Sequence, residues 1–114
     1  MSSLYVDIRP LHLEMAVGDS GLVAVSITNS SSTIDGYRIR VFGLDPEWVT
    51  VTPARVAVFP GETVVVEIGL ALPPLFPAGP RQFTIQVLSE NDPDDFSLVQ
   101  LSASIANQPR ARLK

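Results

Sequence analysis

The sequence predicts an all-β domain, a sandwich of two antiparallel sheets with seven to eight strands. Short segments of alternating apolar and polar residues follow one another, separated by clusters of glycine, proline, asparagine, aspartate and serine. A period of two is typical of strands with one buried face, and regularly spaced turn signals are typical of sandwiches. No window of a dozen residues shows the three-and-four spacing of an amphipathic helix.

Alternation is clearest in three segments. In residues 22–28, Val23, Val25 and Ile27 share one face, while Ser26 and Thr28 lie on the other. The same pattern in residues 37–41 and 83–87 places β-branched or aromatic side chains inward, as half-buried strands require. The other predicted strands are a first strand made of residues 4–8 and 11–15 on either side of Pro10, and strands at residues 48–51, 55–59, 63–70 and 99–105.

Two prolines predict features of the backbone. Pro10 interrupts the first alternating segment, so we expect a first edge strand that bends there or switches sheets. Pro60 and Gly61 suit the central positions of a type II turn, because proline presets φ and glycine accepts a positive φ.

Length and composition indicate one domain with a core. The chain has 114 residues, of which 46% are hydrophobic and 18% charged, and disordered chains lack this much core material. Cysteine is absent, which excludes disulfides, thiolate chemistry and cysteine-ligated zinc. We expect residues 1–106 to form the domain and residues 107–114 to form a basic C-terminal tail or linker.

Charge and hydropathy exclude two kinds of partner. The tail carries three of the eight basic residues, which leaves five in residues 1–106 against all twelve acidic residues. This negative body should repel nucleic acid. No segment approaches the roughly 20 apolar residues of a membrane-spanning helix, and the start shows no signal-peptide pattern. As written, the chain is expected in the cytoplasm, or at the cell surface if it belongs to a longer protein.

Turn and strand motifs along almost the whole chain resemble one family. Those motifs are Val17-Gly18-Asp19, Val25-Ser26-Ile27-Thr28-Asn29, Tyr37, Pro60-Gly61-Glu62 and Pro77-Ala78-Gly79, and they look like the bacterial immunoglobulin-like domains that accompany carbohydrate-active enzymes and cell-surface proteins. More narrowly, residues 47–51, 52–56 and 59–61 are similar to repeats of multi-domain actinobacterial proteins labelled hydrolytic proteins. The resemblance implies an immunoglobulin-like sandwich, one unit of a longer array, and no catalytic residue that could be transferred.

The residues give no sign of catalysis. His12 is the only histidine, at a predicted outward position, so a Ser-His-Asp arrangement would have to be built around it. The Gly-x-Ser-x-Gly nucleophile motif is absent. We therefore interpret His12 as a surface histidine and expect a chain that is not an enzyme, with no catalytic residues.

The acidic run Glu90, Asp92, Asp94 and Asp95 is the best metal candidate, because calcium favours clustered carboxylates. Its spacing lacks the glycine and the distal glutamate of the calcium-binding loop. A solvated turn around Asp92 and Pro93 explains the run more simply. We therefore expect no metal and no cofactor.

The aromatic side chains argue against a sugar-binding surface. Most of the eight are expected in the core, and Trp48 is interpreted as a core side chain and not as a sugar platform. One outer face is expected to be polar and merely solvated. That face comprises Arg38, Arg40, Gln82, Thr84, Gln86, Gln100, Ser102 and Ser104.

Apolar residues at outward positions mark the predicted partner contacts. A contiguous exposed patch of such residues would indicate a partner or a neighbouring domain. Leu75 and Phe76 lie in a proline-rich loop that can equally fold back over the end of the sandwich. The predicted contacts are Leu22, Phe42, Phe59, Val65, Leu75 and Phe76.

The function predicted from these patterns is a non-catalytic structural or protein-interaction module, one unit of a larger immunoglobulin-like array or assembly. Its partner would be a protein or a neighbouring immunoglobulin-like domain, and self-association is possible. The alternative is an accessory domain that binds a carbohydrate or a cell-envelope polymer.

Overall fold

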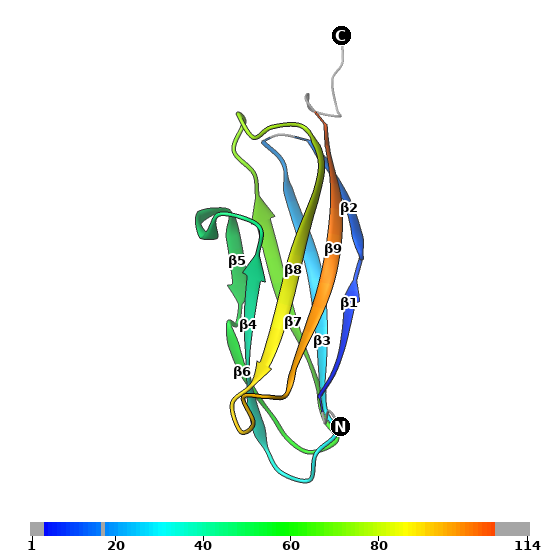
Figure 1. Ribbon diagram of the computed structural model, residues 1–114, viewed down its shortest axis with the longest axis vertical. Helices are drawn as coiled ribbons and strands as arrows, with labels where there is room; N and C mark the ends of the chain where they lie inside the picture. Colours follow the sequence, from blue (N-terminus) through cyan, green and yellow to red (C-terminus); the bar gives the residue numbers. More distant parts are fainter. Residues whose placement is uncertain (1–3, 17, 107–114) are drawn as a thin grey trace.

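The computed structural model describes residues 4–16 and 18–106, so the predicted tail, residues 107–114, lies outside the described part. Nine strands and one short 3-10 helix make up this part (Figure 1). In chain order they are β1 (Leu4–Arg9), β2 (His12–Ala16), β3 (Ser20–Asn29), β4 (Asp35–Phe42), η1 (Pro46–Trp48), β5 (Val49–Thr52), β6 (Arg55–Val58), β7 (Thr63–Ala71), β8 (Gly79–Ser89) and β9 (Phe96–Ala106).

The strands form two packed sheets, which confirms the predicted sandwich. The first sheet has the order β1-β3-β7-β5, and the second has the order β2-β9-β8-β4-β6. Figure 1 shows the two layers running along the length of the molecule. The first alternating segment divides at Pro10 into β1 in one sheet and β2 in the other, so of the two predicted alternatives, a bend or a sheet switch, the structure has the switch.

One pairing departs from the predicted antiparallel pattern. β2 runs parallel to β9, whereas every other strand pair among the described residues is antiparallel. The sheet switch explains this difference, because the chain keeps its direction as it passes Pro10 and so meets β9 running the same way. The division also raises the strand number from eight to nine.

Alternation along the strands builds the core between the sheets. Val23, Val25 and Ile27 of β3 are fully buried, and Phe83 and Ile85 of β8 are nearly so. The inward faces predicted from the sequence are therefore confirmed in both sheets. Burying each such side chain contributes roughly 1.5–3 kcal/mol.

The turn between β6 and β7 also has the predicted form. Gly61 has a φ of 77°, and the backbone N–H of Glu62 donates to the carbonyl of Phe59 over 3.0 Å. Proline, then glycine with positive φ, then a closing hydrogen bond together define a type II turn. The sequence prediction for this turn is confirmed.

The aromatic side chains are less buried than expected. Tyr37, Phe76 and Phe83 lie in the core, and Trp48, predicted to begin a strand, ends η1 and packs half-buried against the core. The expectation that the core uses most of the aromatic side chains is wrong, because the other four are exposed, although two of them, Phe42 and Phe59, were predicted to face outward. Those exposed aromatics are Tyr5, Phe42, Phe59 and Phe96.

Candidate functional site

Strand β4 has a neighbour along only part of one edge. β6 pairs with residues 35–38 of β4, and the N–H of Ile39 donates to the carbonyl of Ala54 over 3.1 Å. β8 pairs with the opposite edge of β4 as far as Phe42. Residues 40–42 therefore have no strand beside them on the β6 side, and we call them the open segment of β4.

The backbone of Val41 faces this open side. Successive residues of a strand direct their N–H and C=O groups to opposite edges. Because the N–H of Ile39 points toward Ala54, the polar backbone groups of Val41, two residues on, point the same way. No described strand pairs with Val41 there.

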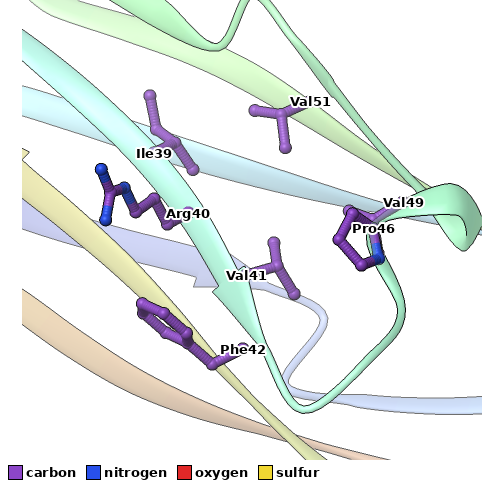
Figure 2. A pocket seen from close by; sticks show the side chains of 7 residues that line it. All are labelled: Ile39, Arg40, Val41, Phe42, Pro46, Val49 and Val51. Atoms are coloured by element: carbon purple, nitrogen blue, oxygen red, sulfur yellow. The ribbon is translucent and has the colours of Figure 1, made fainter.

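A second open edge lies beside the first. β5 is the last strand of its sheet and pairs only with β7. Between β5 and the open segment is a groove of about 240 Å³. Figure 2 shows Ile39 and Val41 on the side of β4 that faces β5, with Arg40 and Phe42 on the other side. The groove is lined by Ile39, Arg40, Val41, Phe42, Pro46, Val49 and Val51.

The floor of this groove belongs to the hydrophobic core. Ile39 is buried, and Val41, Val49 and Val51 are half-buried and pack against the core. Most of the lining is aliphatic, so the groove offers apolar contact. Core side chains can therefore be reached from outside at this place, because no strand closes the gap between the two sheets.

Helix η1 supplies Pro46 to the groove, and polar and aromatic contacts hold η1 in place. The Asp45 side chain accepts a hydrogen bond of 2.9 Å from the N–H of Glu47, which caps η1. The ring of Trp48 meets the ring of Phe76 edge to face, with centroids 5.2 Å apart. The guanidinium of Arg81 lies 5.3 Å from the centre of the Phe76 ring.

These contacts correct one predicted site residue. Phe76 is only 8% exposed, so its ring covers the end of the sandwich and is not available to a partner. The proline-rich loop folds back through Phe76, one of the two alternatives left open by the sequence. Its neighbour Leu75 is 94% exposed at the tip of the same loop.

The other predicted contacts are exposed but dispersed. Phe42 lines the β4–β5 groove, and Phe59 lies in the β6–β7 turn. Leu22 and Val65 share the outer face of the first sheet but are not cross-strand neighbours. Leu22 lies opposite Gly69, and Val65 lies opposite Ser26. Leu22 borders a second hollow of about 450 Å³, formed where β3, β5 and β7 carry small residues. The six predicted contacts therefore do not form one patch.

The charged residues beside the open segment differ sharply in their pairing. Arg38 Nε donates to Glu90 Oε2 over 2.9 Å, and Arg55 donates to both carboxylate oxygens over 2.7 and 2.8 Å. The hydrogen bonds from Arg55 and then Arg38 lower the pKa of Glu90 from 4.5 to about 2. Arg40 forms no hydrogen bond or ion pair with any described residue. It is the uncompensated charge beside the groove.

Sequence reasoning missed this groove because its parts were assigned to ordinary roles. Arg40 was placed on a solvated face, and Val49 and Val51 in a short strand. The sequence carried no signal for it, because the predicted strands 37–41 and 55–59 are equally long, whereas in the structure β6 is half as long as β4. A short neighbour leaves part of a longer strand without a partner.

The only histidine lies within a small polar cluster. His12 Nδ1 is 2.7 Å from Ser102 Oγ, while His12 Nε2 is 3.8 Å from Glu14 Oε2 and 3.5 Å from Ser104 Oγ. Serine, histidine and carboxylate are the residue types of a hydrolytic triad. These side chains lie on an outer sheet face, and neither of the two hollows is lined by them. The geometry therefore supplies hydrogen bonds on the outer face of the sheet, outside both hollows.

The acidic run forms a hydrogen-bonded turn. Its first member, Glu90, binds Arg38 and Arg55, and Asp92 Oδ1 accepts from the N–H of Asp94 over 3.1 Å. Among the described residues, no group of three or more histidine, aspartate or glutamate side chains could hold a metal ion. In the same part of the chain, no helix is long and apolar enough to cross a bilayer.

Compared by sequence, the chain matches no protein family and no curated protein. Several solved structures share its fold. A family 123 glycoside hydrolase from Clostridium perfringens superimposes with a TM-score of 0.77 at 8% identity, over 94% of this chain and 28% of that chain. A FixG-related protein from Vibrio parahaemolyticus gives 0.71 at 14% identity, over 92% and 98%.

A third similar structure is the CupB2 chaperone of Pseudomonas aeruginosa, with a TM-score of 0.63 at 18% identity, over 92% of this chain and 57% of that chain. The chain thus spans 28% of the length of the hydrolase and 57% of the length of the chaperone. Identities this low establish the immunoglobulin-like β-sandwich alone. The narrower resemblance to actinobacterial repeats stays a prediction.

Proposed function

We propose that this chain is a non-catalytic protein-interaction module that binds a partner protein in the β4–β5 groove. The single observation that carries the proposal is an apolar groove between two open strand edges, with core side chains as its floor. Open edges present unpaired backbone groups that readily pair with another chain. The partner would close the gap between the two sheets.

The size of the groove favours protein side chains over a small ligand. Pockets for drug-sized molecules and cofactors measure roughly 300–1,000 Å³. A cavity of roughly 150 Å³ holds a benzene ring. A volume of about 240 Å³ therefore accommodates one or two apolar side chains.

Two further observations support a protein partner. One of the similar structures is a chaperone, a class of protein that acts on other proteins. Other exposed apolar side chains, among them Leu22, Val65 and Leu75, would serve contacts with neighbouring domains if the chain is part of an array. That array role rests on the sequence motifs, and light scattering of the isolated chain would test its tendency to self-associate.

The test is selection from a displayed library of random peptides, followed by two variants. Selected peptides should bind the wild type and lose binding to Val51→Glu, which places a charge in the groove. They should still bind Val65→Glu, a matched control because Val65 lies in the same sheet as Val51 but is exposed on its outer face, away from the groove. A library without binders, or binders that do not distinguish the two variants, would contradict the proposal. Circular dichroism must show both variants folded.

A second candidate function, binding of a carbohydrate, is favoured by the exposed aromatics of the second sheet. Phe42 and Phe96 are each 46% exposed on its outer face, which also carries Gln86 and Gln100. Exposed rings and amides are suitable sugar contacts. A glycan array would detect such binding, which Phe96→Ala should then weaken. No signal on the array would remove this candidate.

A further inference from the structure

We infer that the partner segment binds as an added β-strand along the open segment of β4, with an aliphatic side chain in the groove and an acidic side chain beside Arg40. This inference rests on the proposed function and specifies its partner. Three features of the site carry it, namely the backbone of Val41, the apolar groove and the unpaired charge of Arg40.

The backbone of Val41 sets the mode of binding. Its N–H and C=O point to the side where β6 has ended, in continuation of the hydrogen bond between Ile39 and Ala54. A peptide in extended conformation can take up both groups and continue the sheet, which is recognition by strand addition. One partner residue then lies directly opposite Val41.

The groove sets the side chain of that central residue. Residues opposite each other on neighbouring strands point to the same face of the sheet. Val41 points toward Val49 and Val51, so the residue opposite Val41 also points into the groove (Figure 2). The inward-facing side chains there, those of Val41, Val49 and Val51, are aliphatic, which favours valine, leucine or isoleucine.

Arg40 and Phe42 set the side chains on either side of the central residue. Both point to the outer face, so the partner residues opposite them point outward as well. Arg40 has no ion-pair partner among the described residues, whereas Arg38 and Arg55 share Glu90. A carboxylate opposite Arg40 makes a favourable cross-strand pair, and an apolar side chain opposite Phe42 covers its ring.

The same charge argues against two other occupants. The tail of this chain, residues 107–114, has three basic residues and no acidic residue, so Arg40 would repel it. A basic partner segment would be disfavoured for the same reason. The recognition element is therefore three residues long, a central aliphatic residue with an acidic residue on the Arg40 side and an apolar residue on the Phe42 side.

The test uses a capped nine-residue peptide in which every second residue is valine. Of the residues between the valines, one is glutamate, one is phenylalanine and the others are threonine. The glutamate and the phenylalanine flank the central valine. Titration into the isotope-labelled chain should shift the amide signal of Val41 and slow its hydrogen exchange. A control peptide with an N-methyl group on the central valine, whose N–H would pair with Val41, should not bind. The same group on a neighbouring residue should be tolerated.

Charge exchange tests the acidic residue. Replacing the glutamate of the peptide with lysine should weaken binding about three- to tenfold, and Arg40→Glu should do the same to the original peptide. The lysine peptide should recover its affinity for the Arg40→Glu chain. Thermal melting must show that this variant is folded.

The outcomes separate the inference from the proposed function. If no peptide binds, including those selected from the library, the proposed function fails. If the nine-residue peptide binds without protecting the Val41 amide, or if the lysine peptide binds equally well, the inference fails and the groove function stands. Self-association that Arg40→Glu abolishes would identify a second copy as the occupant and would also overturn the inference.

Discussion

The two halves of β4 carry similar sequences but have different surroundings. Each contains an outward arginine next to an inward aromatic or β-branched residue, yet β6 covers residues 35–38 and leaves residues 40–42 open. In the covered half, Arg38 is paired, and in the open half, Arg40 is not. The difference shows that strand neighbours, and not the alternation itself, decide whether a charged side chain stabilises the fold or is available to a partner.

The covered half also contains a buried carboxylate, that of Asp35, whose hydrogen bonds are satisfied. Asp35 accepts hydrogen bonds from the Ser89 hydroxyl and from the Asn91 N–H, while its neighbour in space, Asn29, donates to the carbonyl of Val58 over 2.8 Å. All three side chains, Asn29, Asp35 and Ser89, are buried. This network closes the end of the sandwich, whereas the open half has no equivalent.

Removing the carboxylate of Asp35 should have the largest effect on the covered half. Asp35→Ala leaves the Ser89 hydroxyl and the Asn91 N–H without their acceptor, which costs about 3 kcal/mol of the free energy of unfolding. Urea denaturation measures this loss. Asp94→Ala, at an exposed position of the nearby turn, should change stability by less than about 0.5 kcal/mol. Equal losses in the two variants would contradict the role given to Asp35.

Tyr37 gives the covered half a response to alkaline pH. Burial, then the charges of Asp35 and Asp95, raise the pKa of its hydroxyl from 10.0 to about 12. Between pH 10 and 12 the unfolded chain releases this proton and the folded chain keeps it, so stability falls as the pH rises through that window. Two pKa units correspond to at most about 2.7 kcal/mol, and with solvent screening we expect about 1–2 kcal/mol.

Tyr37→Phe is the control for that response. The Tyr37 hydroxyl makes no hydrogen bond with any described residue, so its removal leaves no partner unsatisfied. At pH 7 the free energy of unfolding of the variant should equal that of the wild type within about 0.5 kcal/mol. Above pH 10 the variant should lose less stability, because it lacks the contribution of the Tyr37 hydroxyl. Urea denaturation at pH 8 and pH 11 compares the two. A marked loss at pH 7 would show that the hydroxyl is bonded.

Glu90 gives the covered half a response to acid. Its pKa is lowered to about 2, so its stabilising contribution is fully present above pH 4.5 and is lost as the pH falls through about 2. Glu90→Gln should abolish the loss of stability that Glu90 causes at acid pH. The loss of stability that Tyr37 causes above pH 10 should stay unchanged. Thermal melting between pH 2 and pH 6 compares the two chains. A variant with the full acid dependence of the wild type would exclude Glu90 as its source.

Gly36 makes room for the ion pair between Glu90 and Arg55. A Cβ at this position would lie 2.6 Å from Glu90 Oε1 and 2.8 Å from Arg55 Nη2, closer than real contacts allow. Gly36→Ala should therefore displace the two side chains and raise the pKa of Glu90 from about 2 toward its ordinary value of 4.5. NMR titration of the Glu90 carboxyl measures the shift. An unchanged pKa would mean that the pair moves aside without loosening.

The fold could be predicted from the sequence because its signals are local. The alternation of apolar and polar residues predicted that Val23, Val25 and Ile27 are buried, and Pro60 with Gly61 predicted a turn. Each of these signals spans only a few residues. The parallel pairing of β2 with β9 was not predictable in this way. It depends on strands about 90 residues apart, and alternation does not encode which strands become neighbours.

The candidate site was harder to predict for the same reason. Phe42 was recognised as outward-facing, and it does line the groove. The role proposed for Arg40 depends on where β6 ends and on Glu90, which forms ion pairs with Arg38 and Arg55. Neither feature can be seen in residues 38–42 alone. Phe76 was misassigned because its burial depends on Trp48, which lies in a different loop.

The smallest expected effect belongs to the open half. Arg40→Gln should change the free energy of unfolding by less than about 0.5 kcal/mol, because Arg40 bonds to no described residue. Arg38→Gln is the matched change, two residues earlier on the same face of β4. It should raise the pKa of Glu90 by removing one of the two arginines that donate hydrogen bonds to this carboxylate. Urea denaturation and NMR titration of both variants compare the two halves directly. If Arg40→Gln costs more than about 1 kcal/mol, the charge already stabilises the folded chain, and the open half is less available to a partner than its geometry indicates.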